Sequence, residues 1–196
     1  MTARLNLLAH GASAATRAAR FPDDENLEPS AVSALQVLRG RLRPYAQVLT
    51  SPARAALDTA AALGFDAKLE AALRDCDYGR WRGLASKEVA EREPDAFAAW
   101  LGDPLSAPHG GESLTALIER VGAWTTQALA REGATLAVTH ASVVRAAIVH
   151  ALGAGSSAFA RIDVTPLTLA RLSGHAGRWT LVALGPFATL GRATNA

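Results

Sequence analysis

Two short stretches place a histidine directly after an apolar run: residues 7–13, Leu7-Leu8-Ala9-His10-Gly11-Ala12-Ser13, and residues 138–145, Val138-Thr139-His140-Ala141-Ser142-Val143-Val144-Arg145. Each run is typical of a buried strand, and the small residues that follow mark its end. In open α/β sheets, ligands bind at the carboxyl ends of the strands. We therefore expect His10 and His140 to meet at the ends of neighbouring parallel strands and to share one ligand.

The rest of the chain alternates between strand and helix patterns. Short apolar runs predict strands at residues 4–9, 47–50 and 134–139, and a terminal hairpin of residues 165–172 and 179–184. Helical spacing or capping residues predict helices at residues 31–42, from Ser51-Pro52 to 63, from 113 to about 131, and from 140 to 152. This alternation predicts an α/β fold, a three-layer sandwich with a mostly parallel central sheet and helices on both faces.

Two segments are predicted loops. Residues 21–29 contain Pro-Asp-Asp-Glu-Asn and form an expected exposed acidic loop. Residues 75–83, Asp-Cys-Asp-Tyr-Gly-Arg-Trp-Arg-Gly, mix charges, aromatic residues and glycines, a composition typical of a functional loop rather than a core element.

The composition is that of a globular domain. The chain has 196 residues, of which 49% are hydrophobic and 19% charged, which is enough for one substantial core. We expect a single domain over residues 1–196, with about the last ten residues loose. The 20 basic and 18 acidic residues are scattered along the chain, so no nucleic-acid partner is expected.

Cysteine content and the first residues indicate the compartment. Cys76 is the only cysteine, which excludes an internal disulfide and fits a reducing environment. The first apolar run is too short for a signal peptide or a membrane span. We expect a cytoplasmic protein without a membrane partner, and the sequence does not indicate its oligomeric state.

Five motifs occur in an order known from one family. They are His10-Gly11 with Arg20-Phe21, Ser51-Pro52 through Thr59-Ala60, Tyr78-Gly79-Arg80-Trp81-Arg82-Gly83, Gly110-Gly111-Glu112-Ser113, and Thr139-His140. Together they resemble the histidine phosphatase superfamily, which includes phosphoglycerate mutases and small phosphomonoesterases. The resemblance covers nearly the whole chain and implies the phosphoglycerate mutase-like fold.

The resemblance implies a mechanism through a phosphohistidine. His10 would attack phosphorus, Asp75 would protonate the leaving oxygen, and His140 would stabilise charge on the transferring group. Asp75 is chosen because it stands four residues before Gly79, and Asp77 is the alternative acid. The phosphate of a small phosphorylated metabolite would be bound by Gly11, Thr16, Arg20 and Arg54. No metal and no cofactor is implied.

The chain departs from the family pattern where phosphate is usually clamped. Ala9 stands where the family has arginine before the first histidine, and Ala55 stands four residues before Thr59, where the second arginine is usual. Thr16 replaces the usual asparagine. Losing two donors of this kind without compensation costs about 10⁴ to 10⁶ in turnover. Compensation would come from arginines near the motifs in sequence, namely Arg17, Arg20, Arg54 and Arg145.

Two hypotheses follow. The first is a phosphomonoesterase with an altered phosphate pocket, and the second is a catalytically inactive phosphoester-binding or regulatory protein on the same fold. A mutase is less favoured than a phosphatase, because a mutase must hold the intermediate while the substrate reorients. A nucleotide-binding α/β domain lacks support, since the chain has neither a Gly-x-Gly-x-x-Gly motif nor a phosphate-loop lysine motif.

Overall fold

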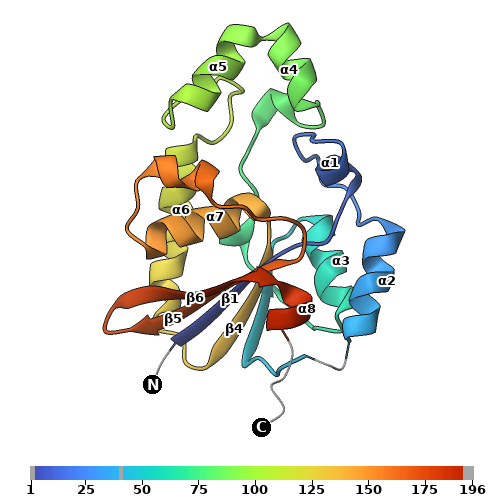
Figure 1. Ribbon diagram of the computed structural model, residues 1–196, viewed down its shortest axis with the longest axis vertical. Helices are drawn as coiled ribbons and strands as arrows, with labels where there is room; N and C mark the ends of the chain where they lie inside the picture. Colours follow the sequence, from blue (N-terminus) through green and yellow to red (C-terminus); the bar gives the residue numbers. More distant parts are fainter. Residues whose placement is uncertain (1–2, 40–41, 192–196) are drawn as a thin grey trace.

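The computed structural model describes residues 3–39 and 42–191, and Figure 1 shows their arrangement. The strands are β1 (Ala3–Ala9), β2 (Gln47–Thr50), β3 (Lys68–Leu69), β4 (Ala134–Thr139), β5 (Thr168–His175) and β6 (Arg178–Pro186). The α-helices are α1 (Ala14–Arg17), α2 (Pro29–Leu38), α3 (Arg54–Ala62), α4 (Ser86–Arg92), α5 (Pro94–Gly102), α6 (Leu114–Ala128), α7 (Ala141–Ala151) and α8 (Phe187–Leu190). Short 3₁₀ helices are η1 (Ala71–Leu73), η2 (Gly79–Trp81) and η3 (Ser156–Arg161).

A six-stranded sheet in the order β3-β2-β4-β1-β5-β6 forms the centre of the molecule. Strands β3, β2, β4 and β1 are parallel to one another, and β5 is antiparallel to both β1 and β6. In the central pair, Leu7 lies opposite Ala137 and Ala9 opposite Thr139. The predicted mostly parallel sheet is therefore confirmed.

Helices cover both faces of the sheet (Figure 1). On one face, Leu5 and Leu7 of β1 belong to a core cluster with Val121 of α6 and Val144 of α7. On the other face, Leu8 belongs to a second cluster whose helical members come from α2, α3 and α8, among them Leu35, Ala56 and Phe187. Neighbouring residues of β1 thus enter different clusters, as expected for a strand buried on both faces. These two clusters confirm the three-layer sandwich.

Helices α4 and α5 lie beyond the end of the sheet and form a cap (Figure 1). Trp81, which is fully buried, packs with Phe21 and Trp100 at ring-centroid distances of 5.4 and 5.8 Å. The Trp81 indole nitrogen donates a hydrogen bond to Glu93 between the two helices. This aromatic cluster connects the acidic loop of residues 21–28 to the cap.

Several predicted boundaries were wrong. Helix α3 begins at Arg54 rather than at Ser51-Pro52, because Ala53 has an extended backbone (φ −69°, ψ 143°) and is itself the N-cap residue. The Ser51 hydroxyl instead contacts His140. Helix α2 begins at Pro29 and ends at Leu38, and the predicted extension to residue 42 crosses residues 40–41, which lie outside the described residues.

Differences also occur near the C-terminus. Strand β5 continues to His175, because the hairpin turn consists only of Ala176 and Gly177, both with positive φ. Residues 187–190, predicted to be loose, form α8, and the remaining residues of that prediction, 192–196, lie outside the described residues. Within residues 3–39 and 42–191, no helix combines the length and apolarity needed to cross a bilayer.

Candidate active site

The two predicted histidines lie side by side at the carboxyl ends of β1 and β4. Because Ala9 pairs with Thr139 in this parallel ladder, the next residue of each strand enters the same space. The backbone amide of His10 donates to the carbonyl of Thr139 at 2.8 Å, and the two imidazole rings are 5.1 Å apart between centroids and nearly perpendicular. The predicted meeting of His10 and His140 is thus present in the structure.

A backbone contact fixes the tautomer of neutral His10. Its Nδ1 lies 2.8 Å from the carbonyl oxygen of Gly11. A carbonyl oxygen only accepts hydrogen bonds, so Nδ1 carries the proton and Nε2 keeps its lone pair. The Gly11 amide in turn donates to the hydroxyl of Thr59 on α3 at 3.0 Å, which holds this turn in place. In the neutral ring, Nε2 is therefore the nitrogen without a proton.

His140 lies deeper than His10. Its Nε2 is 2.8 Å from the Ser51 hydroxyl, and its Nδ1 is 3.4 Å from Oδ2 of Asp75. Burial lowers the pKa of His140 to about 4, opposed by the nearby Asp75 carboxylate and assisted by His10 and Arg120. At neutral pH and without a ligand, His140 is uncharged.

Asp75 reaches the histidines from the loop after η1. One of its carboxylate oxygens accepts from the hydroxyl of Ser142 and from the backbone amide of Cys76, the latter at 2.8 Å. Its other oxygen faces His140. By contrast, the alternative acid Asp77 accepts from the backbone amide of Gly79 and pairs with Arg82 at 3.6 Å. The contact with His140 favours Asp75 over Asp77.

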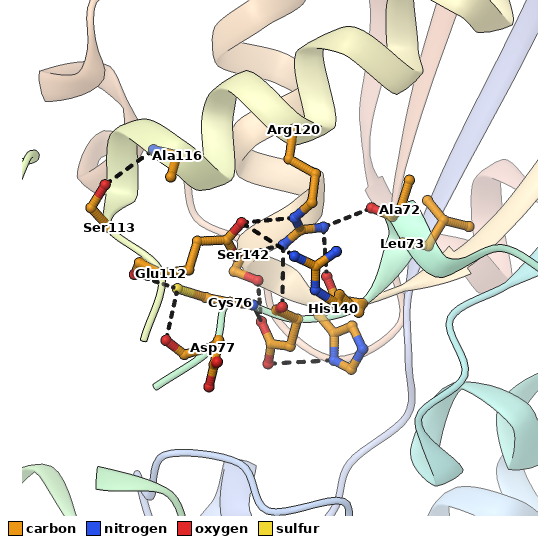
Figure 2. A network of polar contacts seen from close by, with 12 residues as sticks. Ala72, Leu73, Cys76, Asp77, Glu112, Ser113, Ala116, Arg120, His140 and Ser142 are labelled. Atoms are coloured by element: carbon orange, nitrogen blue, oxygen red, sulfur yellow. Dashed lines mark hydrogen bonds and ion pairs between the residues drawn. The ribbon is translucent and has the colours of Figure 1, made fainter. Parts of the chain in front are cut away.

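An internal ion pair supports the segment that carries Asp75 (Figure 2). Arg120 of α6 binds Glu112 through two hydrogen bonds of 2.8 and 2.7 Å, and both side chains are largely buried. The same guanidinium donates to the carbonyls of Ala72, Arg74 and Asp75 at 2.7, 3.1 and 3.2 Å. These three hydrogen bonds fix the backbone from Ala72 to Asp75.

His10, His140 and Asp75 line a cavity of about 420 Å³. Its polar lining combines His10 and His140 with hydroxyls, two guanidiniums and several carboxylates: Ser13, Thr16, Ser51, Arg74, Arg82, Asp23, Asp24, Glu25, Asp75 and Asp77. Among the described residues, no group of three or more His, Cys, Asp or Glu side chains is arranged to hold a metal ion. Within this lining, His140 is in contact with both His10 and Asp75.

Comparison with known proteins gives the family. The model of the histidine phosphatase superfamily (branch 1) matches residues 5–185. This chain belongs to that superfamily. A bifunctional protein of Mycobacterium tuberculosis is 33% identical over 180 residues, which cover 85% of this chain and 50% of that protein. The chain thus spans about half the length of this relative.

Phosphatases are among the similar proteins of the superfamily. A glucosyl-3-phosphoglycerate phosphatase of Mycolicibacterium vanbaalenii is 35% identical over 127 residues, covering 60% of this chain and 56% of the relative. The native structure of a mycobacterial glucosyl-3-phosphoglycerate phosphatase superposes with a TM-score of 0.80 at 25% identity, covering 95% of this chain and all of the other. The histidine phosphatase fold is therefore shown over nearly the whole chain.

The structure does not bring the predicted phosphate-binding residues together. The Arg20 guanidinium donates to the carbonyl of Gly83 at 2.9 Å, and Arg54 lies exposed with its Nε 4.0 Å from Asp24; neither residue lines the cavity. The Thr16 residue does line it, but its hydroxyl takes part in a capping box with Ser13. Gly11 is buried, with its amide bonded to Thr59.

The resemblance leads us to expect arginine at two positions that hold Ala9 and Ala55. Both alanines are buried, and Ala55 lines the cavity. Of the arginines considered as compensation, Arg17 pairs with Glu28, and Arg145 donates to the carbonyl of Ile162 at 2.8 Å. The guanidiniums that line the cavity instead belong to Arg74 and Arg82.

Sequence reasoning missed the hydroxyls that surround His140. Ser51 follows β2 as His140 follows β4, so its position at a strand end was an available signal. Ser142 lies on the first turn of α7, two residues after His140, and its contact with Asp75 depends on how the loop after η1 folds back. No local pattern indicates that contact.

Proposed function

We propose that this superfamily member is a phosphomonoesterase that acts on a small phosphorylated metabolite through a phosphohistidine on Nε2 of His10. The observation that carries the proposal is the hydrogen bond from His10 Nδ1 to the Gly11 carbonyl. It leaves a lone pair on Nε2 inside the cavity, next to a second histidine and a carboxyl group. A neutral imidazole held in one tautomer is a competent nucleophile.

The proposed reaction has two displacements. Nε2 of His10 attacks phosphorus, the ester P–O bond breaks, and the leaving oxygen takes the proton of Asp75 in its acid form. A water molecule then attacks the phosphohistidine, its proton returns to Asp75, and the N–P bond breaks to release phosphate. The ring of neutral His140 lies 5.1 Å from that of His10 between centroids, and a bound phosphoryl dianion would favour the protonated form of His140.

The relatives support the phosphatase proposal at the level of reaction class. Glucosyl-3-phosphoglycerate phosphatases share the fold and part of the sequence. The sequences align over only part of each protein, so these relatives support the reaction class and not a particular substrate.

Hydrolysis of p-nitrophenyl phosphate from pH 4.5 to 7.5 tests the proposal, with the protein and His10→Ala prepared identically. We expect release of p-nitrophenol by the protein and only background release by the variant. Labelling with a ³²P substrate, stopped with alkaline detergent, should trap a base-stable, acid-labile phosphoenzyme in the protein alone. Equal background rates in both would overturn the proposal and leave a phosphoester-binding role on the same fold.

A further inference from the structure

The cavity around His10 and His140 is lined by more carboxylates than cations. Five acidic residues contribute to its wall, three of them consecutive in the loop after α1: Asp23, Asp24, Glu25, Asp75 and Asp77. The basic lining residues are Arg74 and Arg82. A phosphate dianion alone would be repelled by such a wall, because the field of a cleft follows the sign of the charges that line it.

The acidic loop is held in a defined position. At its start, the amide of Phe21 donates to the carbonyl of Leu84, just before the cap, and at its end the amide of Glu28 donates to the carbonyl of Ala12. In the middle, Asp24 has a φ of 61° and accepts the backbone amide of Arg54 at 2.8 Å, at the N-terminus of α3. The loop therefore presents its charges to the cavity from a fixed backbone.

The cations near the cavity already have acidic partners. Arg74 lies 3.8 Å from Glu112 and Arg82 lies 3.6 Å from Asp77. By contrast, within residues 3–39 and 42–191 neither Asp23 nor Glu25 forms an ion pair. The Glu25 carboxylate instead accepts the backbone amide of Asp23 at 3.2 Å. Two carboxylates that line the cavity are thus available to a ligand cation.

We propose that the substrate is a phosphomonoester that also carries an ammonium group, and that Asp23 and Glu25 bind this group while His10 receives the phosphoryl group. The inference rests on the proposed phosphatase function and names its substrate class. It follows from the position of the two unpaired carboxylates in the wall of the cavity that also contains the histidines. The phosphate and the cation would then enter opposite parts of one ligand site.

The test compares 2-aminoethyl phosphate with propyl phosphate, which has the same shape but a methyl group in place of the ammonium. At low salt we expect kcat/KM to be at least about tenfold higher for the amine, which corresponds to about 1.4 kcal/mol. The ratio should fall as salt increases, because the two rim charges, those of Asp23 and Glu25, are exposed and partly exposed to solvent, respectively. His10→Ala supplies the background rate for both substrates.

Paired variants locate the effect. Asp23→Asn with Glu25→Gln keeps the hydrogen-bond acceptors but removes both charges, and should bring the ratio close to one, because the ammonium group loses its two partners. Asp66→Asn with Glu132→Gln removes two charges from exposed residues outside the cavity and should leave the ratio unchanged.

The possible failures are distinguishable. Hydrolysis of both substrates through His10 at equal kcat/KM, or a preference that survives removal of the two rim charges, overturns the ammonium inference and leaves the phosphatase proposal standing. Absence of hydrolysis of both substrates and of p-nitrophenyl phosphate overturns the phosphatase proposal and this inference with it.

Discussion

Replacing Arg120 with alanine should damage both stability and turnover, although its side chain does not line the cavity. The substitution leaves the largely buried Glu112 carboxylate with only Arg74, at 3.8 Å, and removes the donor of three backbone carbonyls. Breaking a buried ion pair by removing one partner costs about 3 to 5 kcal/mol. The free energy of unfolding should fall by that amount.

The effect on turnover follows from the position of Asp75. Once its backbone carbonyl and those of Ala72 and Arg74 lose their common donor, the carboxyl group is no longer fixed against His140. A displacement of about 1 Å at a reacting group costs about 10² in rate. We expect kcat for p-nitrophenyl phosphate to fall by about 10²-fold in variant protein that is still folded at the assay temperature, with a much smaller change in KM.

Urea unfolding and steady-state kinetics measure the two effects, with two control variants. Arg120→Lys keeps the charge but not the planar fork, and should retain part of the stability while losing most of the turnover. Arg92→Ala breaks an exposed pair with Glu88 four residues away on α4, and should cost less than about 0.5 kcal/mol with unchanged kcat. A loss below about 1 kcal/mol in Arg120→Ala, together with unchanged kcat, would refute the reasoning.

Two further predictions concern stability. The pKa of His140 is about 4 in the folded protein and about 6.5 in the unfolded chain. Between these pH values the unfolded state binds more protons, so the free energy of unfolding should fall by up to about 3 kcal/mol as pH falls through this window. Urea midpoints against pH should show a steeper decline for the protein than for His140→Gln, and parallel curves would contradict this. Gly79→Ala should cost more than about 2 kcal/mol, since φ is 48° and an added Cβ would lie 2.1 Å from the His109 carbonyl oxygen. Gly102→Ala, at an open site, is the matched control, and equal thermal midpoints for the two variants would contradict the argument.

Much of the sheet followed from local patterns. The strands predicted at residues 47–50 and 134–139 have those bounds in the structure, because apolar side chains buried on both faces leave a continuous hydrophobic run. The start of α3 was harder to predict from the sequence. Ser51-Pro52 has the usual capping order, but the Ser51 hydroxyl is bonded to a histidine 89 positions away. That competing partner belongs to the tertiary structure.

The cavity also combines features that the sequence indicates with features that only the tertiary structure sets. The acidic loop could be located from its composition, whereas its position in the wall beside His10 depends on anchors to the cap, to α3 and to Ala12. Arg20 and Arg54 are close to the motifs in sequence but are bonded to Gly83 and to Asp24 instead. A long flexible side chain reaches many partners, so its position in the chain does not indicate its target.

The sequence by itself determined five of the six strands, all except β3, and the histidines that follow β1 and β4, because hydrophobic periodicity and the ends of apolar runs are local properties of the chain. It also determined the family, through motifs that keep their order. Only the tertiary structure decided the tautomer of His10, the buried and neutral state of His140, the support of Asp75 by Arg120, and the charge of the cavity wall. Each of these depends on burial or on a hydrogen-bond partner, and most of those partners lie on other segments of the chain.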